Sequence, residues 1–213
     1  MTHIGLFYVG AVLIINGLAL IGVISGRAAA PINLMVGALQ VLIPITLFTN
    51  PESGAPQYLA AAGILLFGIT YLWVGLSELA GIPSDGFGWF SLFVAIAAVL
   101  MVLENLRVSA WSGAAQWAVW AGLWTAFFLV LGLGKSGLTT FTGWFAIIAG
   151  VTTTGVPGAL GLAGRWEERP AVAIGILGVT GLGLLIAGIA TRARPVSSGR
   201  DSGRTAEAAT ATG

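Results

Sequence analysis

Long apolar stretches alternate with short polar segments along almost the whole chain. The apolar stretches occupy roughly residues 4–25, 31–49, 58–77, 88–103, 114–133, 141–164 and 171–190. Each is near the ~20 residues that an α-helix needs to cross ~30 Å of hydrocarbon. The ionisable side chains (9 Lys or Arg, 8 Asp or Glu and one His) all lie outside these stretches. The pattern therefore predicts an all-α membrane protein whose spans carry no charge.

Composition supports a single membrane domain. The chain has 213 residues, of which 57% are hydrophobic and 8% charged, with a mean hydropathy of +0.95. Soluble domains usually hold about 25% charged residues. The segment 195–213 is rich in Ser, Gly, Ala, Thr and Arg and cannot bury enough apolar surface to fold. We therefore predict a polytopic transmembrane channel domain at 1–194 and a disordered cytoplasmic tail at 195–213.

Residue types that carry most catalytic and metal chemistry are scarce. Cysteine is absent and His3, near the N-terminus, is the only histidine. No nucleophile–base pair or metal cluster is readily assembled from this set, so the sequence predicts neither an enzyme nor a cofactor or metal site. A net charge of +1 gives no reason to expect nucleic-acid binding.

The basic residues suggest an orientation. With seven spans and the N-terminus outside, the inner side receives Arg27, Lys135, Arg192, Arg194, Arg200 and Arg204, and the outer side receives Arg107, Arg165 and Arg169. Cytoplasmic loops carry an excess of Lys and Arg. The distribution favours an N-terminus outside and a C-terminus inside.

Related segments open several of the spans. The segment 88–96 begins with Gly-Trp-Phe, as does 143–151, and Pro31 opens the second stretch as a helix-start signal. The simplest interpretation is a bundle of six transmembrane helices, built as three hairpin repeats, plus a seventh helix. The seventh stretch contains five glycines and no aromatic residue, which is typical of a packing helix.

Large apolar side chains follow helical spacing in the odd-numbered stretches, so each set lies on one helix face. They are Leu6, Val9 and Leu13 in the first, Phe67 and Tyr71 in the third, and Trp120, Leu123 and Trp124 in the fifth. Tryptophan in membrane helices usually lies at the two interfaces, but Trp120 and Trp124 fall near the middle of a span. Two interpretations stay open: packing against neighbouring helices or lipid, and an aromatic slot.

An aromatic slot would suit a small, planar, neutral solute, because a ring can pack on a flat amide and leave its edges free for hydrogen bonds. Candidate polar contacts are Asn16, Asn33, Thr70, Tyr71 and Thr125. Each of them could equally satisfy a nearby backbone group. Pro157 predicts a kink in the sixth span, where the hydroxyls of 152–154 are placed to bond carbonyls that the kink frees.

Several segments resemble one family in the same order along the chain. They are Tyr8-Val9-Gly10 through Asn16-Gly17, then 65–72 (LLFGITYL), 89–96 (WFSLFVAI), 120–127 (WAGLWTAF) and 144–148 (WFAII). Together they are similar to the urea and amide channels of the AmiS/UreI family. That family includes the acid-activated urea channel and the amide transporters encoded beside amidases.

The resemblance implies a pore within each protomer, a homo-hexamer in a bacterial inner membrane, and urea or a short aliphatic amide as the permeant. It also implies a functional link to an amidase or urease. The pore residues that it implies are Leu6, Val9, Leu13, Phe67, Tyr71, Trp120, Leu123 and Trp124.

The chain also departs from the acid-activated member. Its segment 50–57 has no histidine, and Ala97 and Ala149 stand where that channel has an asparagine and a glutamate. The missing histidine favours a pore that is active at neutral pH without acid gating. The seventh stretch and the basic tail extend beyond the six-helix plan of the urea channel and resemble the amide-transporter branch. We predict a passive channel or transporter for urea or short amides. The alternatives are an ion-coupled secondary transporter, with sodium coupling still open, and a pore for another neutral solute such as ammonia.

Overall fold

The structure, a computed structural model, describes residues 3–49 and 54–192, and this part of the chain is helical throughout, without strands. The helices are α1 (His3–Leu20), α2 (Gly26–Phe48), α3 (Ala55–Ala80), α4 (Asp85–Arg107), α5 (Trp111–Phe127), η1 (Phe128–Gly132), η2 (Ser136–Leu138), α6 (Thr139–Ala149), η3 (Gly150–Gly155), α7 (Val156–Leu162) and α8 (Pro170–Arg192). Seven helical segments are long and apolar enough to cross a membrane. The predicted all-α class and the seven spans are confirmed. The predicted tail at 195–213 lies outside the described residues.

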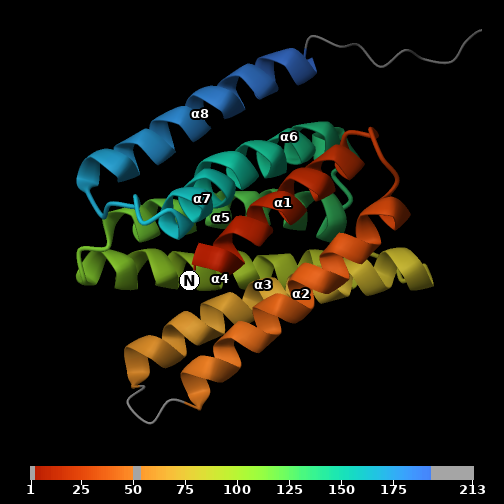
Figure 1. Cartoon of the computed structure of the whole chain (residues 1–213). Coiled ribbons are helices and arrows are strands. Elements are labelled where there is room, and N and C mark those ends of the chain that lie inside the picture. Colours follow the sequence, from red (N-terminus) through yellow and green to blue (C-terminus); the bar gives the residue numbers. More distant parts are fainter. Residues whose placement is uncertain (1–2, 50–53, 193–213) are drawn as a thin grey trace, which may run out of the picture.

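The first six spans form a closed ring. Each packs against the next along the chain, and α1 closes the ring by packing against α6, η3 and α7 (Figure 1). The most extensive packing joins α2 to α3, α4 to α5, and α1 to the sixth span. The predicted six-helix bundle is therefore present, and its closest helix pairs connect one predicted hairpin to the next.

Glycines allow two of these close approaches. A methyl group at Gly88 on α4 would lie 2.1 Å from the backbone nitrogen of Gly132, and one at Gly10 on α1 would lie 2.6 Å from the Cα of Gly155. Both distances are far below van der Waals contact, so no larger side chain fits without moving a helix. Small residues serve this purpose where helices pack in lipid.

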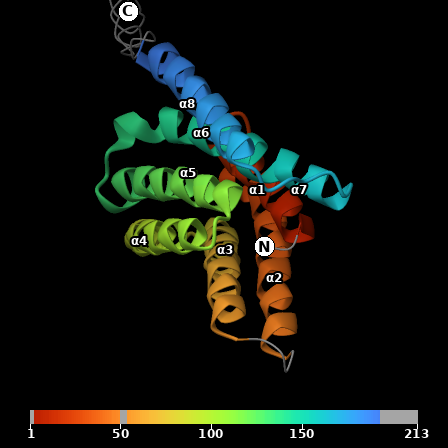
Figure 2. The ribbon, with the colours of Figure 1, turned by 90° about the vertical axis from the view of Figure 1, so that its left-hand side faces the viewer.

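The seventh span, α8, lies outside the ring against α5 and α6 (Figure 2). Only one of its faces is covered, and that face buries Ile176, Thr180 and Ala187. The Thr180 and Thr152 hydroxyls are 2.8 Å apart, which links α8 to the sixth span. The prediction of a peripheral packing helix agrees with this position.

The prediction that Pro31 opens the second span is wrong. Ser25 caps α2, because its hydroxyl accepts a hydrogen bond from the Ala28 N–H, and the helix begins at Gly26. A serine cap satisfies one of the free N–H groups at a helix start. The helix consequently begins one turn earlier than the proline suggested.

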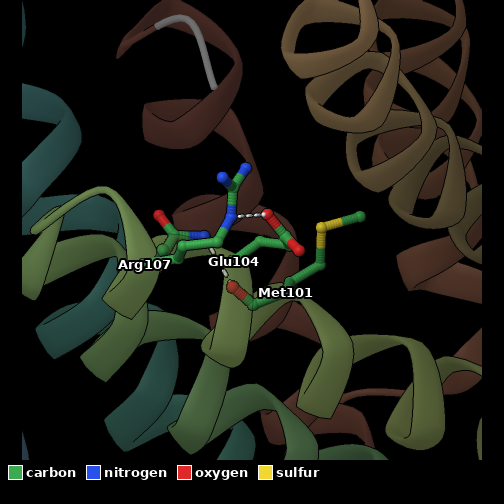
Figure 3. Close-up of polar contacts among 4 residues, drawn as sticks. Met101, Glu104 and Arg107 are labelled. Atoms are coloured by element: carbon green, nitrogen blue, oxygen red, sulfur yellow. Dashed lines mark hydrogen bonds and ion pairs between the residues drawn. The ribbon is translucent and has the colours of Figure 1, made fainter.

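Charged side chains of the described residues lie at span ends or in the connections between spans. At the end of α4, the Arg107 Nε lies 2.8 Å from a Glu104 carboxylate oxygen, and both side chains are exposed (Figure 3). One residue after Glu104, the Asn105 amide donates to the Met101 carbonyl at 2.8 Å. The middle of each described span is left uncharged, as the sequence predicted.

The sixth span has a π-helical segment, η3, which ends two residues before Pro157. The hydroxyls of Thr152, Thr153 and Thr154 each donate to the carbonyl four residues earlier. The carbonyl that Pro157 leaves without its usual helical N–H partner is that of Thr153, because proline has no N–H. Gln116 on α5 bonds this carbonyl instead, with its Nε2 donating at 2.8 Å.

Candidate pore

The apolar side chains predicted to line a pore lie together inside the ring. They come from α1, α3 and α5, and all belong to one buried cluster: Leu6, Val9, Leu13, Phe67, Tyr71, Trp120, Leu123 and Trp124. None of them is more than 5% exposed. The stripes that the spacing placed on separate helices therefore face one another across the centre of the bundle.

Phe67 is the centre of an aromatic constriction. Its ring centroid lies 4.9 Å from that of Trp120 in an edge-on arrangement, and 5.8 Å from that of Trp117. Trp124 and Tyr71 lie 6.1 and 6.2 Å from it. Edge-on and tilted pairs at these separations are favourable for aromatic rings. The rings fill the middle of the bundle without any charged group.

A cavity of about 220 Å³ adjoins this constriction. It reaches Leu13, Tyr71 and Trp124 at its inner end, and its mouth lies near Glu78 and Ser84, where α3 ends and α4 begins. Because one water molecule needs only about 10–15 Å³ of such space, a solute the size of urea fits together with water. The other lining residues are Asn16, Ala19, Leu20, Gly26, Ala29, Thr70, Val74, Ser77, Phe87, Phe127 and Leu131.

Four polar atoms that belong to cavity-lining residues are buried and have no hydrogen-bond partner among the described residues. They are the hydroxyl oxygens of Thr70, Tyr71 and Ser77 and the indole nitrogen of Trp124. An unsatisfied buried polar group costs about 1–3 kcal/mol, so several in one place require an explanation. The indole can only donate a hydrogen bond, whereas the three hydroxyls can donate or accept.

Asn16 and Asn33 form a reciprocal amide pair between α1 and α2. The Asn16 Nδ2 donates to Asn33 at 2.9 Å and the Asn33 Nδ2 donates back at 2.6 Å. Asn33 is fully buried and also donates to the Ala29 carbonyl at 2.9 Å. Asn16 alone of the two lines the cavity. Asn33 therefore holds Asn16 in place.

The structure does not bring Thr125 to the site. Its side chain is exposed, and its hydroxyl donates to the Ala121 carbonyl at 2.8 Å within α5. It follows Trp124 by one residue, and one residue is a rotation of about 100° around a helix. The hydroxyl therefore points away from the face that carries Trp124.

Sequence reasoning missed several polar residues of the bundle interior. Ser77 follows Thr70 by seven residues on α3 and lines the same cavity, so helical spacing was a signal that could have found it. Gln116 on α5 is another, and its Nε2 donates to the Thr153 carbonyl of η3. Gln40 on α2 is fully buried, and neither of its amide atoms has a partner in the described part of the chain, but it does not line the cavity.

Within the described residues, no group of three or more His, Cys, Asp or Glu side chains is placed to hold a metal ion. Glu78, at the mouth, is the one Asp, Glu, Lys, Arg or His residue in the cavity lining of this part of the chain. The lining consists otherwise of apolar, hydroxyl and amide side chains.

The sequence profile of the AmiS/UreI family transporters matches residues 1–165, which include all six spans of the ring. The chain belongs to the AmiS/UreI family. The match ends before α8 begins at Pro170, so the peripheral helix of this AmiS/UreI protein lies beyond the family profile.

Individual relatives agree with this assignment. A putative transporter protein AmiS2 of Rhodococcus erythropolis is 48% identical over 84% of this chain and 87% of its own length. A putative amidate substrates transporter protein of Mycolicibacterium smegmatis is 45% identical over 84% and 85%. The crystal structure of the urea channel from Helicobacter pylori is 31% identical, with a TM-score of 0.70 over 78% of this chain and 100% of that one. This AmiS/UreI protein is therefore a multi-pass membrane protein of a transporter family.

Proposed function

We propose that this protein is a passive channel for urea and short aliphatic amides, with a pathway inside each protomer. The observation that carries the proposal is the cavity at the aromatic constriction, whose lining residues Thr70, Tyr71, Ser77 and Trp124 have buried hydrogen-bonding atoms without a partner among residues 3–49 and 54–192. These atoms are matched to a small neutral solute that brings its own donors and acceptors.

The chemistry of the lining suits an amide. The Trp124 indole N–H donates to the amide carbonyl oxygen, while the hydroxyls of Thr70, Tyr71 and Ser77 accept from the amide N–H groups. Apolar walls such as Leu20 and Phe127 take the alkyl end of a short aliphatic amide. A neutral amide regains much of its lost hydration from such contacts. Beside the aromatic rings, an ion finds no group of opposite charge to offset the loss of its hydration shell.

The names of the relatives support an amide permeant. The proteins at 48% and 45% identity are described as AmiS2 and an amidate substrates transporter, whereas the urea channel is 31% identical. We place this protein on the amide branch, where an intracellular amidase, or a urease for urea, would consume the permeant and maintain its gradient. It is a transport protein and not an enzyme.

The same proposal includes an assembly and an orientation. We propose a homo-hexamer in a bacterial cytoplasmic membrane, with the N-terminus outside and the C-terminus inside. The cavity mouth, beside Glu78 and Ser84, then faces the cytoplasm, because α1 and α3 end on that side. His3 is the only histidine of the chain, which supports conduction at neutral pH without histidine-based acid gating.

Purified protein in liposomes tests this function. Stopped-flow light scattering should show faster influx of acetamide and urea than in protein-free liposomes at both pH 5 and pH 7, with mannitol influx unchanged. Equal rates with and without protein at both pH values would end the channel proposal. Amide influx that requires a sodium or proton gradient identifies an ion-coupled transporter. Alkalinisation of the liposome lumen by ammonia, without amide influx, identifies an ammonia pore.

A further inference from the structure

Trp120 is anchored by a hydrogen bond to the sixth span. Its indole Nε1 donates to the Thr153 hydroxyl oxygen at 2.8 Å, and the Thr153 hydroxyl donates in turn to the Ala149 carbonyl at 2.5 Å. Because the Thr153 proton is committed to that carbonyl, the hydroxyl presents a lone pair to the indole. The direction of both bonds is therefore fixed.

A second bond from α5 reaches the same residue. The Gln116 Nε2 donates to the Thr153 carbonyl at 2.8 Å, and Pro157 leaves this carbonyl without its usual helical partner. Gln116 and Trp120 are one turn apart on α5, so two successive turns bond the side chain and the backbone of one threonine. π-helical segments of this kind occur often at functional sites.

The helix α1 supports η3 from the other side. A methyl group at Gly10 would lie 2.6 Å from the Cα of Gly155 and 3.0 Å from the carbonyl oxygen of Gly150, which are residues of η3. The segment that carries Thr153 therefore packs tightly between α1 and α5. The Thr153 hydroxyl therefore has a fixed position from which it holds the indole ring of Trp120.

The anchored ring is part of the constriction. The Trp120 centroid lies 4.9 Å from that of Phe67 and 4.8 Å from that of Trp117, both in edge-on arrangements. A turn of the Trp120 ring would change the gap beside Phe67. We propose that Thr153 is a positioning residue that holds the plane of the Trp120 indole, and so sets the largest amide that passes the constriction. This inference rests on the proposed amide channel.

Two substitutions at Thr153 and one beside it test the inference. Thr153→Val keeps the shape of the side chain but removes the hydroxyl, and Thr153→Ser restores it. Thr154→Val is the matched control, because the buried Thr154 hydroxyl bonds only the Gly150 carbonyl of its own helix. Because Thr153→Val removes one hydrogen bond, we expect it to change the ratio of butyramide to acetamide flux about 2- to 10-fold. The other two variants should leave the ratio within 2-fold.

A double-mutant cycle separates positioning from a general effect on packing. In a Trp120→Phe background the indole N–H is gone, so adding Thr153→Val should change the flux ratio no further. An additional change in that background of the same size as in the wild type would overturn the inference, as would an equal effect of Thr154→Val.

An indole ¹⁵N spectrum in micelles reports on the bond without transport. The cross-peak assigned to Trp120, by its loss in Trp120→Phe, should shift in Thr153→Val and stay in place in Thr153→Ser and Thr154→Val. A shift without any change in the flux ratio overturns the role in selectivity. Wild-type protein that conducts no amide overturns the proposed function, and an unshifted Trp120 cross-peak in Thr153→Val overturns the positioning bond itself.

Discussion

Trp120 and Trp124 lie one turn apart on α5, but their indole N–H groups have different environments. The Trp120 N–H donates to the Thr153 hydroxyl at 2.8 Å. The Trp124 N–H is buried without a partner among the described residues, and its residue lines the cavity. One tryptophan is therefore fixed by the protein, whereas the other is the donor that the proposed function assigns to a solute.

Removal of the unpartnered Thr70 hydroxyl should lower transport without lowering the stability of the protein. Thr70→Val removes a buried group that costs about 1–3 kcal/mol, so the thermal midpoint in micelles should stay the same or rise. Acetamide flux in liposomes should fall about 2- to 10-fold, because a hydrogen bond to the permeant is lost.

Thr142 is the matched control for Thr70. Its hydroxyl is also buried and unpartnered among the described residues, but Thr142 does not line the cavity. Thr142→Val should have the same small effect on the midpoint and leave flux unchanged. Equal losses of flux in the two variants would show that the cavity is not the pathway.

The close approach of α4 to η1 predicts a large cost for a single methyl group. Gly88→Ala would place that methyl 2.1 Å from the Gly132 nitrogen, so the helices must separate at a cost of about 1–3 kcal/mol. Gly178→Ala on α8 meets no atom within 4 Å and should leave stability unchanged or slightly raise it, since alanine favours helix. Thermal unfolding of the two variants in micelles measures the difference.

Glu168 links the connection before α8 to the start of α5. Its carboxylate accepts from both the backbone N–H and the hydroxyl of Ser112, which satisfies free donors at the helix N-terminus. Glu168→Ala should cost about 0.5–2 kcal/mol of stability, as the loss of a helix cap does.

The neighbouring Glu167 provides the comparison. It pairs with Arg169 at 2.9 Å, and both side chains are more than half exposed, so Glu167→Ala should cost no more than about 1 kcal/mol. A larger loss of thermal stability in Glu167→Ala than in Glu168→Ala would contradict the role of Glu168 as a cap of α5.

The spans and their inward faces could be predicted from the sequence. Apolar runs near 20 residues have few alternatives to membrane helices. Helical spacing predicts one helix face for each set that includes Leu6, Phe67 or Trp120, and the structure buries these three residues. Helical spacing shows which residues share one face of a helix, but not which other helix packs against that face. The closure of the ring between α1 and the sixth span therefore could not be derived from it.

Errors at single residues have local causes. Thr125 was selected by residue type, yet one residue beyond Trp124 it lies on the exposed side of α5. Pro31 predicts too late a start for α2, because the Ser25 cap begins the helix at Gly26. The bond between Trp120 and Thr153 joins residues 33 apart in the chain, and no local pattern predicts such a pair.

The most direct measurement compares acetamide flux through Trp124→Phe and Trp89→Phe in liposomes. Both changes keep an aromatic ring and remove an indole N–H, but Trp89 is 57% exposed on α4 and lies outside the cavity lining. Flux should fall about 3- to 10-fold in Trp124→Phe, the size expected for one lost hydrogen bond, and stay unchanged in Trp89→Phe. Equal flux in both variants and the wild type would contradict a pathway for amides beside Trp124.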